Sequence, residues 1–190
     1  MNSLVNNLLD MARLQSGMVK LNRQWQPLEE VVGSALKAVR STVADHHVRV
    51  NLPEDLPMLE FDAALIERVL SNLLEDAAKY TPPGSTIEIG AAHGTRNHVD
   101  IWVEDNGPGL PAGKEEDIFK KFERGHKESI MPGVGLGLAI CRAIVEAHGG
   151  SIRSAPSRDG GARFIFSLPC GDPPVIGDAV EGTPVEEGLK

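Results

Sequence analysis

The chain has 190 residues, of which 41% are hydrophobic, so it can form one domain with a packed core and short appendages. Its formal net charge of −8 argues against nucleic acid as a partner, because phosphate binding needs a basic patch. No apolar run approaches the roughly 18 residues that span a membrane, so we expect no direct membrane contact. The two cysteines, Cys141 and Cys170, match no metal spacing and favour a reduced, cytoplasmic protein.

An amphipathic helix is predicted over residues 3–15, because apolar residues recur there at helical spacing and Gly17 can end it. Residues 19–25 alternate weakly between apolar and polar and are predicted to form a strand. A second helix opens at Pro27, and a short strand follows at 48–52.

The longest predicted helix covers residues 63–80, with Asp62 as its N-cap and the turn 82–84 after it. Strands at 86–91 and 99–104 follow, joined by a short loop. Seven apolar residues at helical spacing form the predicted buried face of the helix: Leu65, Ile66, Val69, Leu70, Leu73, Leu74 and Ala77.

A long polar connection over residues 110–132 separates these strands from a helix at about 135–148. Connections of this length inside compact domains tend to be lids or disordered segments. Residues 151–155 and 163–168 are predicted to form a hairpin, and the Gly-, Pro- and acid-rich chain from residue 171 is expected to be disordered. Strands joined by short connections favour a mixed, mainly antiparallel sheet with helices on one face, which is a two-layer α/β sandwich.

Three separated stretches carry the residue types of a nucleotide pocket, and the first lies on the longest helix. Asn72, Asp76 and Lys79 fall on one stripe beside the apolar face, because they are spaced at i, i+4 and i+7. The oxygens of the first two suit Mg²⁺, Lys79 can meet a phosphate, and Tyr80 can lie against a purine. The alternative interpretation of this stripe is a solvated helix face.

The second stretch is the sequence Asp-Asn-Gly-Pro-Gly at the end of a predicted strand. The carboxylate of Asp105 can accept the exocyclic amine of adenine. Gly107 and Gly109 let the backbone approach a base closely, because neither carries a Cβ. The alternative interpretation is an ordinary turn after a strand.

The third stretch places Gly133, Gly135 and Gly137 at the start of a helix. The first amides of a helix are unsatisfied, so such a terminus can bind an anion. The stretch is not a Walker loop, because the Gly-Lys-Ser/Thr ending is missing, and no βαβ unit makes it a Rossmann fingerprint.

In this order and at these distances, the three stretches resemble the ATP-binding catalytic domain of sensor histidine kinases, in the GHKL superfamily. The resemblance runs from about residue 20 to 169 and implies the Bergerat ATP-binding fold, with ATP and Mg²⁺ at the site. It divides the chain into a truncated end of the dimerisation and phosphoacceptor helix (1–17), the catalytic domain (18–169) with its lid at about 110–132, and an acidic tail (170–190).

The resemblance also assigns roles residue by residue. It implies a phenylalanine box at Phe119 and Phe122 beside the lid. The residues that it implies for the site are Asn72, Asp76 and Lys79 for catalysis, Asn72 and Asp76 for the metal, and Tyr80, Asp105, Gly107, Gly109, Arg124, Lys127, Gly133, Gly135, Gly137 and Leu138 for the nucleotide.

The implied activity is transfer of the γ-phosphoryl group of ATP to a histidine. None of the six histidines has the family's phosphoacceptor context, a His followed by acid-Leu-Arg-x-Pro, and we expect most of them at the surface. The acceptor is therefore expected on a separate dimerisation and histidine phosphotransfer domain, with a response regulator downstream. The intact protein is expected at the inner face of the cell membrane.

Asp76 departs from the family, which usually has a Mg²⁺-binding asparagine at that position. One alternative is therefore a nucleotide-binding regulatory module whose kinase activity Asp76 impairs. Another alternative is an ATP hydrolase of the chaperone or mismatch-repair branch of the superfamily. Hydrolysis needs a general base, and the matching position here is Asn72, whose amide has no useful basicity, so this alternative is disfavoured.

Overall fold

The computed structural model describes residues 20–95, 97–110, 113, 117–119 and 137–171. The predicted N-terminal helix, most of the predicted lid and the tail beyond residue 171 lie outside the described residues, so those predictions stay untested. Within the described part of the chain, no helix has the length and apolar character to cross a membrane.

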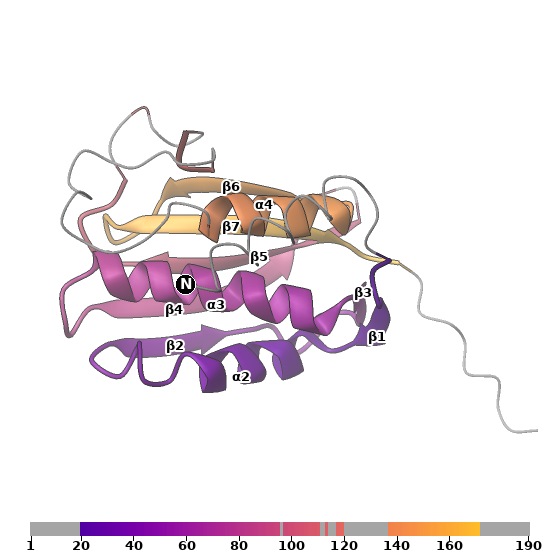
Figure 1. Ribbon diagram of the computed structural model, residues 1–190, viewed down its shortest axis with the longest axis horizontal. Helices are drawn as coiled ribbons and strands as arrows, with labels where there is room; N and C mark the ends of the chain where they lie inside the picture. Colours follow the sequence, from indigo (N-terminus) through magenta and orange to yellow (C-terminus); the bar gives the residue numbers. More distant parts are fainter. Residues whose placement is uncertain (1–19, 96, 111–112, 114–116, 120–136, 172–190) are drawn as a thin grey trace, which may run out of the picture.

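A five-stranded sheet forms one layer of the fold, and three helices cover one of its faces (Figure 1). The order of the strands is β2-β4-β5-β7-β6, in which β2 pairs with β4 in parallel and every other pair is antiparallel. This arrangement confirms the predicted two-layer α/β sandwich. The strands are β2 (His47–Asn51), β4 (Thr86–His93), β5 (His98–Asp105), β6 (Ser151–Pro156) and β7 (Ala162–Pro169), and the helices are α2 (Leu28–Ala38), α3 (Ala63–Tyr80) and α4 (Gly137–Ala147).

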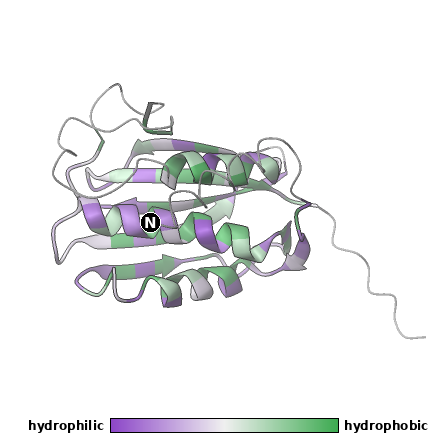
Figure 2. Cartoon of the chain, viewed as in Figure 1, coloured by the Kyte–Doolittle hydropathy of each residue, from purple (hydrophilic) through white to green (hydrophobic). Residues whose placement is uncertain are grey.

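Helix α3 follows the sequence prediction closely. It spans Ala63–Tyr80, and its N-cap Asp62 accepts a hydrogen bond from the backbone N–H of Leu65 at 3.3 Å. All the predicted core residues except Leu65 are buried, and Leu65 is half-buried at the edge of the core. In Figure 2 the helices carry both hydrophobic and hydrophilic residues, as expected for helices that cover one face of a sheet.

Three short elements differ from the prediction. The strand expected at 19–25 is reduced to β1 (Gln24–Gln26), which pairs with β3 (Leu59–Phe61) in a separate two-stranded sheet. Strand β3 was not predicted, because three residues are too few to establish a period-2 pattern. A short 3-10 helix, η1 (Asp117–Phe119), lies within the predicted lid.

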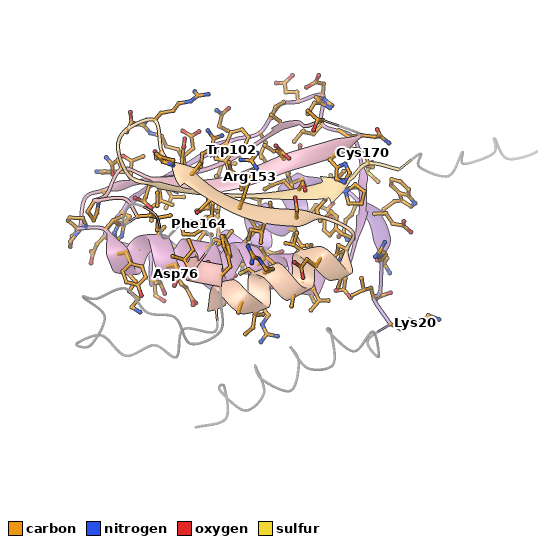
Figure 3. All side chains as sticks on the ribbon, turned by 90° about the horizontal axis from the view of Figure 1, so that it is seen from above. Lys20, Asp76, Trp102, Arg153, Phe164 and Cys170 are labelled. Carbon is orange, nitrogen blue, oxygen red and sulfur yellow. The ribbon has the colours of Figure 1, made fainter. Side chains whose placement is uncertain are left out.

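The sheet face without helices is covered by its own long side chains. Trp102 lies so close to Gly90 on the neighbouring strand that a Cβ there would stand 2.3 Å from the indole ring. The Arg163 guanidinium stacks over the same indole at 4.2 Å and pairs with Glu104 at 3.6 Å. These contacts cover part of the face that has no helical layer, and Figure 3 labels Trp102 and Arg153 on it.

A buried histidine joins the beginning of α3 to the end of α4. His148 is only 1% exposed, although most histidines were expected at the surface. Its Nδ1 lies 2.8 Å from the carbonyl oxygen of Ile144, and its Nε2 accepts the backbone N–H of Asp62 at 3.1 Å. Because a carbonyl only accepts, Nδ1 carries the proton and the ring is neutral. The segment before β1 adds to the junction, since Arg23 donates to the carbonyl of Ala147 at 2.8 Å.

This junction predicts a loss of stability in mild acid. Burial lowers the pKa of His148 below its usual 6.5, so the unfolded chain binds a proton that the folded chain does not. The contribution of neutral His148 to the free energy of unfolding is therefore present above pH 6.5 and is lost as the pH falls below that value. We expect the free energy of unfolding from urea titrations to fall between pH 7 and pH 5, by at most about 1.4 kcal/mol per pH unit for this group.

His148→Gln keeps a donor and an acceptor but cannot titrate, so its unfolding free energy should depend less on pH over the same range. The matched control is His47→Gln on β2, where the histidine is exposed. A His148→Gln profile parallel to that of the unmodified chain would rule out His148 as the cause.

Candidate nucleotide-binding site

The described site residues gather where α3, α4 and β5 meet. Helix α3 packs against both of the other elements. Asn72, Asp76 and Lys79 lie on its C-terminal half, and Asp105 is the last residue of β5. Helix α4 begins at Gly137, the one glycine of the third predicted stretch that lies among the described residues.

Asp105 is the last inward-facing residue of its strand. Val99, Ile101 and Val103 alternate toward the helices and are buried, and the carboxylate of Asp105 continues that series at the end of the sheet. The side chain is only 7% exposed. The same alternation that builds the core therefore places one acid at the edge of the core.

Two backbone amides hold this carboxylate in place. Its Oδ1 accepts the N–H of Gly107 at 2.8 Å and the N–H of Ala162 at 3.2 Å. Burial raises the pKa of Asp105, and the two hydrogen bonds partly oppose the rise. Among the described residues, Oδ2 has no hydrogen-bond partner, so one oxygen of an oriented carboxylate is left to accept a donor.

Close backbone approach explains the glycines around Asp105. A Cβ on Gly107 would stand 2.5 Å from the Cγ2 of Thr81, and Gly109 has a φ of +74°. A Cβ on Gly161 would stand 2.1 Å from the carbonyl oxygen of Asp105 and 2.4 Å from its Oδ1. In the sequence Gly161 falls in the connection of the predicted hairpin, and the paired glycines 160–161 are the one signal that points to it.

Two residues of the polar stripe of α3, Asn72 and Asp76, face α4. The Asn72 amide donates from Nδ2 to the Sγ of Cys141 at 3.7 Å. Oδ2 of Asp76 would lie 4.0 Å from a Cβ on Gly137, so this carboxylate faces the first turn of α4, and Figure 3 labels Asp76 there. The predicted stripe therefore lines an interface between helices, with Asp76 at the positive end of α4.

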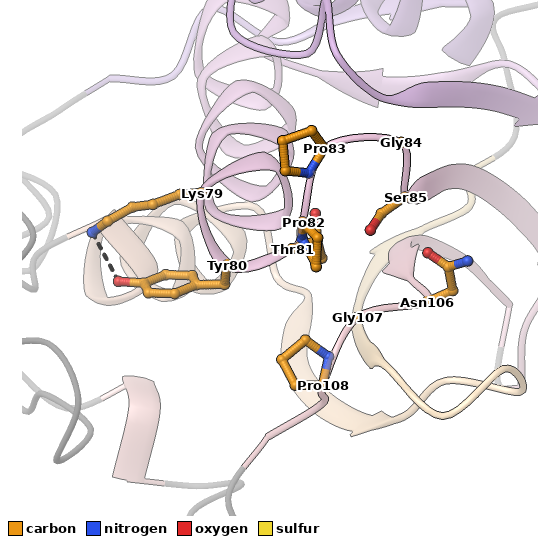
Figure 4. Close-up of a pocket in the computed structure, with 10 residues that line it drawn as sticks. All are labelled: Lys79, Tyr80, Thr81, Pro82, Pro83, Gly84, Ser85, Asn106, Gly107 and Pro108. Atoms are coloured by element: carbon orange, nitrogen blue, oxygen red, sulfur yellow. Dashed lines mark hydrogen bonds between the residues drawn. The ribbon is translucent and has the colours of Figure 1, made fainter.

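Lys79 and Tyr80 end the helix beside an open pocket of about 650 Å³ (Figure 4). Lys79 Nζ donates to the Tyr80 hydroxyl at 2.8 Å and lies 4.7 Å from the ring centroid. The pocket borders Gly107 but does not include Asp105, so it is a hollow beside the carboxylate and not the base pocket itself. Its lining comes from two turns and the end of α3: Lys79, Tyr80, Thr81, Pro82, Pro83, Gly84, Ser85, Asn106, Gly107 and Pro108.

The donor set on α3 fits Mg²⁺. Among the described residues, no group of three or more His, Cys, Asp or Glu side chains is arranged to hold a metal ion. Asn72 and Asp76 offer one amide and one carboxylate oxygen. Mg²⁺ is usually held by one or two carboxylates together with substrate phosphates and waters, whereas structural zinc needs four protein ligands.

Phe119 anchors the described piece of the predicted lid. It is 3% exposed, meets Phe164 edge-on at 6.2 Å, and has the Arg142 guanidinium 4.6 Å above its ring. Leu138 is half-buried against the core. The other predicted site residues, Arg124, Lys127, Gly133 and Gly135, and also Phe122, lie outside the described residues and stay predictions.

Comparison with known proteins agrees with the resemblance in the sequence. The family model described as "Histidine kinase-, DNA gyrase B-, and HSP90-like ATPase" matches residues 61–172. The chain is 54% identical over 169 residues to the sensor protein KdpD of Escherichia coli, covering 87% of this chain and 18% of that protein. It is 40% identical over 168 residues to KdpD of Clostridium acetobutylicum, covering 87% of this chain and 19% of that protein. The chain thus spans about a fifth of the length of these relatives.

Solved structures give the same picture. The mycobacterial sensor histidine kinase MprB matches with a TM-score of 0.67 and 29% identity, over 77% of this chain and 97% of that one. Full-length ShkA in complex with AMPPNP matches with a TM-score of 0.77 and 25% identity, over 88% of this chain and 35% of that one.

The contact of Gly161 with Asp105 predicts that Gly161→Ala weakens nucleotide binding. The added methyl cannot fit, so it must displace the carboxylate or its backbone. Loss of the partner of a buried polar group costs about 1–3 kcal/mol, which is about 5- to 150-fold in the dissociation constant for ATP measured by calorimetry.

The matched control is Gly33→Ala in α2, where a Cβ has nothing within 4 Å. We expect this control to bind ATP unchanged and to be slightly more stable, because alanine favours a helix. Unchanged ATP affinity in a folded Gly161→Ala variant would contradict the role assigned to this glycine.

Proposed function

The chain belongs to the family of histidine kinase-, DNA gyrase B- and HSP90-like ATPases, and on that premise we propose that it transfers the γ-phosphoryl group of ATP to a histidine of a separate domain. The observation that carries the proposal is the Asp105 carboxylate, which two backbone amides fix at the end of β5. The likeness to sensor kinases supports the same activity.

In the part of the site that would hold the nucleotide base, Oδ2 of Asp105 selects adenine. The exocyclic amine of adenine donates a hydrogen bond, and Oδ2 can accept it. Guanine has a carbonyl oxygen at that position, which would meet the carboxylate acceptor to acceptor. Gly107 and Gly161 keep the surroundings of the carboxylate free of side chains, so a flat ring can approach it.

At the phosphate end, the positive terminus of α4 and the Lys79 ammonium attract the anionic chain. Asn72 and Asp76 are the residues that would hold Mg²⁺ from α3. When bound, Mg²⁺ would neutralise charge on the phosphate oxygens. Phosphoryl transfer depends mainly on positioning and charge stabilisation, so these side chains act by orienting the γ-phosphate toward an incoming nucleophile.

The accepting histidine is proposed to come from the protein's own dimerisation and histidine phosphotransfer domain. Of the histidines in the described part of the chain, His148 is buried with both ring nitrogens engaged, so it cannot attack a phosphate. A response regulator downstream would receive the phosphoryl group in turn.

A second candidate function is a nucleotide-binding regulatory module with weak kinase activity. The observation that favours it is the position of Asp76, whose carboxylate faces the turn of α4 that would hold phosphates. A negative charge there attracts Mg²⁺ but repels phosphate oxygens. Phosphoryl transfer is sensitive to misplacement of about 1 Å, so the transfer step would suffer more than binding.

Adenine selection predicts a preference for ATP over GTP. We expect Asp105→Ala to weaken ATP binding by about 5- to 150-fold, because the amine loses its acceptor, and to change GTP binding little. Calorimetry with both nucleotides measures this effect. Asp100→Ala is the matched control, since Asp100 lies on the same strand and pairs with Arg153. Equal binding of ATP and GTP by the unmodified chain would refute the assignment.

The position of Asp76 predicts that Asp76→Asn speeds phosphorylation of a supplied histidine-bearing domain. Repulsion between unit charges about 4 Å apart is about 1 kcal/mol in water and about 4 kcal/mol at an effective dielectric near 20. Removing it therefore corresponds to a gain between about fivefold and nearly a thousandfold.

The measurements are ATP affinity and the rate of phosphohistidine formation, for the unmodified chain and the variant. Glu75→Gln is the matched control, because it removes an exposed charge from the neighbouring position of α3. If Asp76→Asn improves neither quantity, the carboxylate is a tolerated ligand and the second candidate function is wrong.

A further inference from the structure

Cys141 makes two polar contacts across the interface of α3 and α4. It lies on α4 and is fully buried. Its Sγ is 3.7 Å from the Nδ2 of Asn72 and 3.8 Å from the carbonyl oxygen of Val69, both on α3. The sequence alone does not connect this cysteine with the site, because an apolar helix with one thiol is typical of plain core.

The single proton of the thiol fixes the direction of both contacts. A carbonyl oxygen can only accept, so Val69 takes the S–H proton. The sulfur is then left as an acceptor, and the group of Asn72 that can donate to it is the NH₂. The carboxamide must therefore turn its Oδ1 away from the sulfur.

Nothing else in the described part of the chain orients the Asn72 carboxamide. The sulfur is its one hydrogen-bond partner among the described residues. Without that partner, the two ends of the amide could exchange places by a rotation about the last side-chain bond. Oδ1 and NH₂ differ decisively for a cation, because only the oxygen can be a ligand.

We propose that Cys141 is a positioning residue, which holds the Asn72 carboxamide with its oxygen presented to the metal–nucleotide complex. This inference rests on the proposed function and deepens it, because it adds a buried thiol to the residues that shape the Mg²⁺ end of the site. Cys141 itself touches neither metal nor nucleotide.

The contact can be tested first without nucleotide. Cys141→Val loses the donor and the acceptor and adds roughly one methyl group of volume, so the side-chain NH₂ resonances of Asn72 should shift and their protons should exchange faster with solvent. Cys141→Ser keeps a donor and an acceptor and should retain most of the protection. The matched control is Cys170→Val, which removes the chain's other thiol, half-buried at the end of the sheet.

The consequence is tested by calorimetry with ATP, once with Mg²⁺ and once with a chelator. Mg²⁺ should increase the affinity of the unmodified chain for ATP. We expect this increase to be about two- to tenfold smaller in Cys141→Val, close to the value for Asn72→Ala. The affinity for ATP without metal should stay unchanged. Cys141→Ser should keep most of the gain. Equal losses in the valine and serine variants would indicate packing alone and overturn the proposal. Thermal melts of each variant confirm that the fold is retained.

The experiments distinguish failure of the proposed function from failure of the positioning role of Cys141. If the unmodified chain does not bind ATP, the proposed function falls, and this inference falls with it. If the unmodified chain binds ATP with a gain from Mg²⁺ that Asn72→Ala removes, but Cys141→Val keeps the full gain and unchanged Asn72 resonances, only the positioning role of Cys141 is refuted.

Discussion

The hydrogen bonds from the backbone N–H groups of Gly107 and Ala162 to one oxygen of Asp105 are the constraint on which the site depends. They join the turn after β5 to the first residue of β7, so the sheet itself aims the carboxylate. A buried acid would otherwise be costly, and burial indeed raises its pKa. Because the donors are backbone groups, the geometry survives side-chain motion, and the price is the exclusion of a Cβ at Gly161.

Sequence patterns predicted the layers of the fold because those patterns are periodic. The long apolar stripe of α3 and the alternation along β5 indicate which of their side chains are buried. Both elements were found as predicted. Strand β3 escaped prediction because it is three residues long, and its pairing with β1 is a tertiary contact that no local pattern encodes. The buried state of His148 likewise depends on Asp62, which is 86 residues away in the chain.

The residues of the candidate site also fall into those that a sequence pattern predicts and those that depend on tertiary contacts. Residues in family motifs, such as Asp105 and Gly107, could be predicted as site residues from the sequence, because glycine and acid at fixed spacing form a signal. Gly161 and Cys141 were missed as site residues, since each acts on a motif residue that is distant in sequence. Gly161 does not adopt a positive φ, so its need for glycine is a matter of space beside Asp105, which appears only when β5 and β7 are brought together.

The antiparallel pairing of α3 and α4 explains why cation and phosphate groups would meet at one end of the molecule. His148 joins the end of α4 to the beginning of α3, and Cys141 contacts Asn72 near the middle. Asp76 then faces Gly137 at the start of α4. This register puts the positive terminus of α4 beside the C-terminal half of α3, whose negative end is offset by Lys79 in its last turn. With metal and nucleotide bound as proposed, a charge at position 76 would act on the metal, the phosphates and the helix terminus together, so its effect on transfer should exceed its effect on the fold.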